Sequence, residues 1–121
     1  TTEIYTLSLH DALPICTAAY LDEVRQKLGS SDHDRFARFV TSPGVGHDLT
    51  GPGAATADLI TALVDWVEKG IAPDQLVATG SVTDTFGTRT FERPLCPFPR
   101  FPRYIGNGDP DKASSFSCAV S

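Results

Sequence analysis

A loop rich in glycine and proline constrains this chain more than any other segment. Residues 41–52 read TSPGVGHDLTGP, a composition that interrupts both helix and strand. An apolar segment, FARFV at residues 36–40, leads into the loop, and an amphipathic segment follows it. The sequence therefore predicts an α/β arrangement in which His47 lies on a turn between a strand and a helix.

The segment after the loop predicts a helix over residues 57–69, with Thr56 as N-cap and Gly70 as the stop. At helical spacing, one apolar face is expected to contain Ile60, Leu63, Val64 and Val67, widened by Leu59, Ala62 and Trp66. Trp66 is interpreted as a packing anchor against a sheet.

The remaining elements are predicted from the same kind of pattern. Residues 18–28 predict a surface helix that buries Leu21, Val24 and Leu28, and residues 30–34 predict a polar turn with a solvated His33. Residues 76–79 predict a short strand, followed by a loop or hairpin over residues 80–88.

The C-terminal part, residues 89–121, is expected to be an extended, proline-rich arm. Its run TFERPLCPFPRFPRYIG contains four prolines, which exclude a helix and disfavour an inner strand. Arginines alternate with aromatic residues there, a pattern found in RNA-binding segments and in ligands of proline-recognition domains. The formal charge of −5 favours the simpler interpretation, in which the aromatic side chains pack and the arginines face water.

Composition excludes several classes of partner. The acidic balance predicts no nucleic-acid partner, and no run approaches the ~18 apolar residues of a membrane span. The three cysteines, Cys16, Cys96 and Cys118, include no C-x-x-C pair, which argues against a thiolate metal site. Cys96 and Cys118 could pair across the arm, as suits an oxidising compartment.

The first fifteen residues, TTEIYTLSLHDALPI, follow neither helical nor strand periodicity. In one reading frame they match a translated sequencing adapter, so residues 1–15 are interpreted as an artefact that is disordered and carries no function, including His10 and Asp11. The domain of interest is then residues 16–121, divided into a strand and helix part (16–88) and the arm (89–121).

His47 has three possible roles on sequence alone. A histidine in a glycine-rich loop could act as a general base, could stabilise the loop through a hydrogen bond, or could bind a metal with Asp48 and His33. In α/β hydrolases the catalytic histidine follows a late strand and precedes a closing helix, which is the context of His47.

Three motifs together resemble the C-terminal end of the tannase and feruloyl esterase family. They are PGVGHDLTGPG, LITALVDWVEKGIAPDQLVAT and RPLCPFPRFPRYIGNGDPDKASSFSC, and the resemblance extends from about Phe36 to Cys118. It implies the C-terminal part of an α/β-hydrolase sheet and, for the parent protein, a secreted or periplasmic serine esterase acting on small aromatic esters of phenolic acids. It also implies His47 as catalytic histidine, a Cys96–Cys118 disulfide, and a lid domain, with a calcium site, outside this chain.

The chain departs from the family pattern at one position. Many members carry a cysteine directly after the catalytic histidine, bonded to a cysteine beside the nucleophile, whereas this chain has Asp48. Asp48 could instead raise the basicity of the histidine through its charge.

The nucleophilic serine and the triad aspartate are expected upstream of Cys16, so the 121-residue chain alone is expected to be inactive. No cofactor is expected within it. The rival hypothesis is a non-catalytic secreted module, stapled by Cys96 and Cys118, that binds a partner through its arm.

Overall fold

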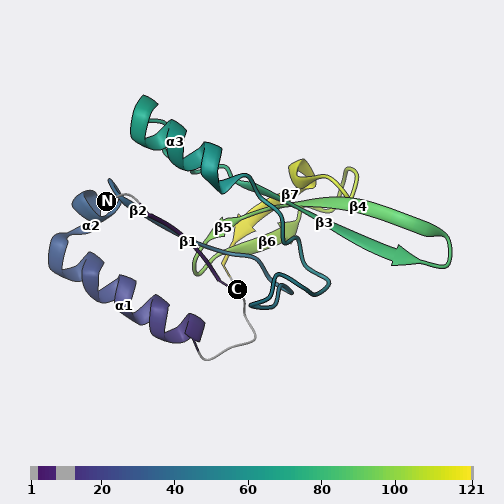
Figure 1. Ribbon diagram of the computed structural model, residues 1–121, viewed down its shortest axis with the longest axis horizontal. Helices are drawn as coiled ribbons and strands as arrows, with labels where there is room; N and C mark the ends of the chain where they lie inside the picture. Colours follow the sequence, from purple (N-terminus) through teal and green to yellow (C-terminus); the bar gives the residue numbers. More distant parts are fainter. Residues whose placement is uncertain (1–2, 8–12, 121) are drawn as a thin grey trace.

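A computed structural model describes residues 3–7 and 13–120 of the chain. Its central feature is a three-stranded sheet of order β1-β2-β5, formed by Glu3–Leu7, Ala37–Thr41 and Cys96–Pro97. Strands β1 and β2 are parallel, and β5 joins the other edge of β2 in the antiparallel direction. Helices α1 (Leu13–Leu28) and α3 (Leu59–Lys69) lie on opposite sides of this sheet, and the short α2 (Ser30–His33) leads into β2 (Figure 1).

The second half of the chain forms two antiparallel pairs. Strands β3 (Val77–Asp84) and β4 (Gly87–Pro94) make a long hairpin that projects away from the helices (Figure 1). Strands β6 (Phe101–Tyr104) and β7 (Phe116–Ala119) pair beside it, with the 3₁₀ helix η1 (Ala113–Ser115) leading into β7. The order strand, loop, helix, strand is as predicted, but β3 pairs with β4 and does not join the sheet of β2.

The C-terminal arm differs from the prediction. Residues 89–94 belong to β4, and Pro102 lies within β6, opposite Cys118 of β7. Proline is tolerated there because each of these sheets has only two strands, so each strand has an open edge that needs no donor. About half of the described residues of the arm therefore lie in paired strands.

Residues 3–7 were left out of the predicted fold, yet they form β1. Every residue from Glu3 to Leu7 pairs in parallel register with β2, from Ala37 to Thr41. The open edge of β2 accepts an extended segment because backbone pairing depends little on which side chains the segment carries. Helix α1 likewise begins at Leu13, ahead of the predicted boundary. His10 and Asp11 lie outside the described residues.

A compact apolar core lies where β2, the loop, the hairpin and β5 meet. Its buried members are Val40, Ala54, Ala78, Phe91 and Leu95, with Ala57, Leu59 and Leu76 packed against them. Two backbone hydrogen bonds between Thr56 and Thr79 (3.1 and 2.7 Å) attach the end of the loop to β3. The core therefore fixes both ends of the loop that carries His47.

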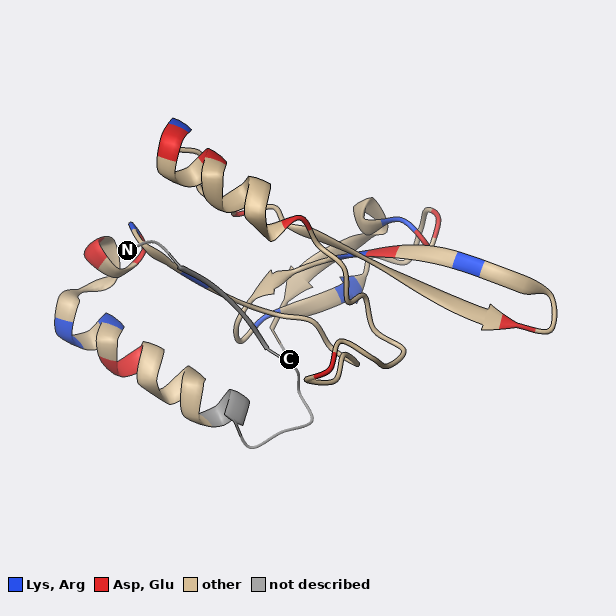
Figure 2. Ribbon diagram, viewed as in Figure 1, with Lys and Arg blue, Asp and Glu red and all other residues tan. Residues whose placement is uncertain are grey.

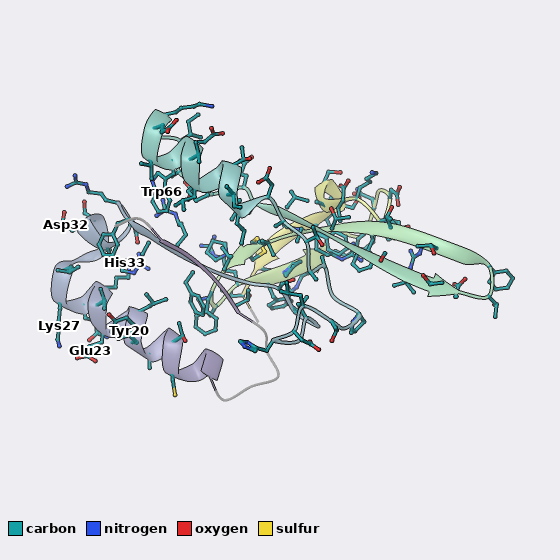
Figure 3. The ribbon with its side chains drawn as sticks, viewed as in Figure 1. Tyr20, Glu23, Lys27, Asp32, His33 and Trp66 are labelled. Carbon is teal, nitrogen blue, oxygen red and sulfur yellow. A yellow bond between two sulfur atoms is a disulfide. The ribbon has the colours of Figure 1, made fainter. Side chains whose placement is uncertain are left out.

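Trp66 anchors α3 on the sheet, as predicted. Its side chain is buried (Figure 3). The guanidinium of Arg38 on β2 stacks over its ring at 4.8 Å. Arg38 also donates a 2.7 Å hydrogen bond from Nε to Asp74, just beyond the helix. A single arginine thus links the central strand to both α3 and the segment that follows it.

The prediction of which residues form the buried face of α3 is wrong in part. Ile60 is 79% exposed and Val67 is 64% exposed, although both were predicted to be buried. The helix instead packs through Leu59 and Trp66, because α3 meets the sheet along the adjoining edge of its broad apolar surface. On α1, Leu21 is buried as predicted, whereas Leu28 is exposed.

Lysine at either exposed position should improve solubility without destabilising the fold. We expect Ile60→Lys and Val67→Lys to reduce self-association while changing the free energy of unfolding by less than about 0.5 kcal/mol, because neither side chain contacts the core. Sedimentation and urea titration measure the two quantities. Leu59→Lys is the matched control and should destabilise clearly; equal destabilisation by Ile60→Lys would contradict the observed orientation of α3.

The N-cap of α3 is Asp58 and not the predicted Thr56. The backbone of Thr56 instead pairs with that of Thr79 in an antiparallel β-bridge. The Asp58 carboxylate accepts a 3.0 Å hydrogen bond from the Thr61 amide, and this bond lowers the pKa of Asp58 below its usual 3.8. Gly70 ends the helix in the left-handed conformation (φ 70°), as predicted.

Asp58→Ala should lower the melting temperature at neutral pH. Because the folded pKa is depressed, the stabilisation is present above pH 3.8 and is lost as the pH falls through the folded pKa. The melting temperatures of variant and wild type should therefore converge in acid. A difference that stayed constant down to pH 2 would contradict a role for the ionised cap.

Candidate active site

The loop after β2 folds back on itself before it reaches α3. Gly53 donates a 2.9 Å hydrogen bond to the carbonyl of Gly44, and Gly46 donates a 2.6 Å bond to that of Thr50. The hydroxyl of Ser42 donates to the Ala54 carbonyl at 2.6 Å, closing the base of the loop. Residues 42–46 and 50–54 thus run side by side, with residues 47–49 at the tip.

Glycine is required where these two segments touch. A Cβ on Gly53 would lie 2.3 Å from the Pro43 carbonyl oxygen, and one on Gly51 would lie 2.4 Å from that of Gly44. Both contacts involve backbone atoms that cannot rotate away. The glycine-rich composition therefore has a steric cause, which is the close approach of the two halves of the loop.

His47 lies in a turn at the tip of this loop. The Leu49 amide donates a 3.0 Å hydrogen bond to the Gly46 carbonyl, so the turn spans four residues with His47 second. Leu49 adopts a left-handed backbone (φ 62°), an uncommon conformation for a residue with a side chain. Strained backbone of this kind is typical of functional sites.

The imidazole is exposed and borders a cavity of about 490 Å³. The cavity is largely apolar, with His47 and the hydroxyl-bearing Ser42 and Thr56 among its lining residues; the others are Val45, Gly46, Leu49, Ala54, Ala55, Ala57, Leu59, Ala78 and Leu95. No described side chain forms a hydrogen bond with the His47 ring. The ring therefore lies at the cavity with no side-chain partner among the described residues.

Among the described residues, no serine or aspartate forms a hydrogen bond with the His47 ring. Ser42 shares the cavity, but its hydroxyl is already donated to a backbone carbonyl. Asp48 directs its carboxylate to Thr50, accepting from the hydroxyl at 2.7 Å and from the amide at 3.2 Å. These bonds, the hydroxyl first, hold the pKa of Asp48 below its usual 3.8.

The structure does not assemble the suggested metal site of His47, Asp48 and His33. His33 is buried on α2, where Nδ1 lies 2.9 Å from Asp34 and the ring packs 5.8 Å from that of Phe36 (Figure 3). The expectation of a solvated His33 is wrong, because the turn coils into α2 and folds the ring inward. Among the described residues, there is no group of three acidic, histidine or cysteine side chains that could hold a metal.

Sequence reasoning missed two structural features of the loop. Thr50 holds Asp48, and the pattern Asp-x-Thr was a usable signal, since aspartate commonly bonds the amide two residues on. The strained Leu49 had no such signal, because nothing in a leucine marks a left-handed backbone.

The predicted disulfide between Cys96 and Cys118 is present. It joins β5 of the central sheet to β7, with the two Cα atoms 5.5 Å apart, and Cys96 is completely buried. Cys16 is free and exposed. The bond fastens the C-terminal strands to the strand beside the loop.

The arginines of the arm are largely engaged within the chain. Arg93 lies between the rings of Phe91 and Phe116 (4.9 and 4.1 Å) and donates to the Pro110 carbonyl at 2.9 Å. Arg89 forms an ion pair with Asp111. Basic side chains are spread over several elements and interleaved with acidic ones (Figure 2). None of the described helices has the length and apolar character needed to cross a membrane.

Solved esterases share this fold. An esterase from Aspergillus oryzae superposes with a TM-score of 0.79 at 24% identity, covering 98% of this chain and 27% of its own. Feruloyl esterase B from the same organism superposes with a TM-score of 0.66 at 23% identity, covering 98% of this chain and 26% of its own. The arrangement around His47 is therefore that of one part of an esterase fold.

The chain belongs to the tannase and feruloyl esterase family, whose model matches residues 10–119. The mono(2-hydroxyethyl) terephthalate hydrolase of Piscinibacter sakaiensis is 45% identical over 85 residues, which are 70% of this chain. A probable feruloyl esterase of Arthroderma benhamiae is 45% identical over 104 residues, or 83% of this chain. The chain spans only 14% and 19% of the lengths of these two relatives.

Proposed function

We propose that this chain is the C-terminal segment of a carboxylic ester hydrolase in which His47 is the general base. The observation that carries this proposal is the free His47 imidazole at the mouth of an apolar cavity, on a strained turn after a parallel strand. A general base needs an unengaged ring nitrogen within reach of the nucleophile. Family membership supplies the reaction class.

The proposed chemistry follows the serine esterase pattern. His47 takes the proton of a serine as its oxygen attacks the ester carbonyl, and then delivers that proton to the departing alcohol. Water then attacks the acyl-serine ester with His47 again taking the proton, which releases the acid and restores the serine hydroxyl. An aspartate holds the second ring nitrogen. Because no described residue supplies the serine or the aspartate, both are proposed to come from sequence upstream of Cys16.

Small aromatic esters are the proposed substrates. The names of the relatives point to feruloyl and terephthalate esters, and both have an aromatic acid next to the scissile bond. The apolar lining beside His47 suits such a group. A secreted or periplasmic location is proposed because the Cys96–Cys118 disulfide is typical of oxidising compartments.

The rival hypothesis is a binding module that recognises a partner through its arm, and the structure supports it less well. Its candidate recognition residues Arg89 and Arg93 are already paired with the segment around Asp111, and Arg93 is stacked between two rings. A partner would have to displace these contacts. The arrangement favours a structural role for the arm.

The purified 121-residue chain is expected to show no hydrolysis of methyl ferulate above the buffer rate. A lone base without a nucleophile or oxyanion donors provides little acceleration. Product release measured by chromatography tests this expectation. Hydrolysis that disappears in His47→Ala would contradict the proposed division of the triad between this segment and upstream sequence.

A further inference from the structure

The Asp48 carboxylate is committed to the turn that carries His47. One oxygen, Oδ1, accepts both the Thr50 hydroxyl (2.7 Å) and the Thr50 amide (3.2 Å). The Thr50 carbonyl in turn accepts the Gly46 amide at 2.6 Å. The Asp48–Thr50 bonds close residues 48–50 into a local turn, and the Thr50 carbonyl joins this turn to Gly46, the residue before His47.

This turn needs external support because it contains a strained residue. Leu49 holds a φ of 62°, which costs a residue with a Cβ free energy that the surrounding contacts must offset. A single backbone bond, such as that from the Leu49 amide to the Gly46 carbonyl, is enough to close an ordinary turn. Ordinary turns, however, lack the strain at Leu49. The two bonds from Thr50 to Asp48 join the residues on either side of Leu49. They are the additional restraint on the Leu49 backbone.

We propose that Asp48 and Thr50 form a clasp that positions His47, through the bonds of Asp48 to Thr50 and of the Thr50 carbonyl to Gly46. This inference rests on the proposed function of His47. Asp48 and Thr50 are positioning residues, since they act through the backbone and do not touch the imidazole. The clasp restrains the loop from within, since every bond that forms it lies between residues 46 and 50.

An electrostatic role for Asp48 is the competing explanation. The carboxylate is exposed, so water screens its effect on the neighbouring ring. The two bonds to Thr50 lower the pKa of Asp48 more than the charge of His47 does. Conformation and charge can be separated experimentally because asparagine keeps the Oδ1 acceptor and removes the charge.

Amide hydrogen exchange in the 121-residue chain tests the clasp. Exchange at Gly46, Leu49 and Thr50 should accelerate roughly 5- to 10-fold in Asp48→Ala and in Thr50→Val, as expected for the loss of one or two exposed hydrogen bonds. Asp48→Asn and Thr50→Ser should stay within about twofold of wild type, since each retains its hydrogen-bonding group. The three-bond coupling between the amide and Hα protons of Leu49 depends on φ. It should keep the value of a left-handed backbone only in the variants that retain the clasp.

Asp84→Ala is the matched control. Asp84 accepts the Phe86 amide at 2.8 Å in the hairpin turn, the same kind of local bond at a distant site, so its loss should leave exchange at residues 46–50 unchanged. Unaltered exchange in Asp48→Ala would overturn the proposal, and so would Asp48→Asn behaving like Asp48→Ala. Neither readout requires catalysis, so failure of the clasp and failure of the general-base role are distinguishable.

Discussion

Alanine in place of His47 is expected to lower kcat/KM about 10⁴-fold in a chimera that restores the upstream part of the enzyme. The chimera joins the upstream portion of the mono(2-hydroxyethyl) terephthalate hydrolase of Piscinibacter sakaiensis to residues 16–121 of this chain. That relative is 45% identical to this chain over 85 residues. Hydrolysis of mono(2-hydroxyethyl) terephthalate is the assay.

The size of this loss follows from the proposed position of His47. Its ring has no described hydrogen-bond partner and borders an apolar cavity, so its removal leaves a serine with no acceptor for its proton. His33→Gln is the control, because it also replaces a histidine. Because His33 is buried away from the loop, it should lower the melting temperature while kcat stays within about threefold. Equal kcat values for His47→Ala and His33→Gln would contradict the proposal.

Removal of the Cys96–Cys118 disulfide is expected to lower the free energy of unfolding by roughly 3 kcal/mol. The bond closes a loop with a sequence separation of 22, and the restriction it places on the unfolded chain gives a stabilisation of that size. Cys96→Ala/Cys118→Ala should show this loss in urea titration, and reduction of the wild type should reproduce it. Alanine is preferred to serine because a hydroxyl at the fully buried Cys96 would add a second cost.

Cys16→Ser provides the comparison for the disulfide variant. Cys16 is exposed and unbonded, so its replacement should change the free energy of unfolding by less than about 0.5 kcal/mol. A loss below about 1 kcal/mol in the double alanine variant would show that the C-terminal strands hold β5 without the covalent link. The β6–β7 pairing and the contacts of Arg93 would then be sufficient.

Local signals in the sequence predicted the elements nearest the loop. The strand before it, the helix after it, the stop at Gly70 and the buried Trp66 all follow from periodicity and end signals within a few residues. The disulfide came from family resemblance, since three cysteines alone allow several pairings. These features depend little on what the rest of the chain does.

Features set by tertiary context were predicted poorly. The apolar surface of α3 is broad, so the sequence alone does not say which edge of it is buried. The position of β2 decides that Trp66 packs inward while Ile60 faces outward. His33 became buried because its turn coils against Phe36, which no local polarity signal reveals. Strand β1 formed at an edge that β2 leaves open, and the arm formed pairs because each strand had one available partner.

Rescue by added imidazole tests the role of His47 most directly. If His47 is the general base, His47→Ala in the chimera should regain activity by at least roughly tenfold as imidazole is added, and the gain should follow the neutral form of the base. The same addition should not stimulate the chimera that retains His47. Activity of His47→Ala that equals the parent chimera, or a loss that no concentration of imidazole reverses while the variant remains folded, would contradict the general-base role.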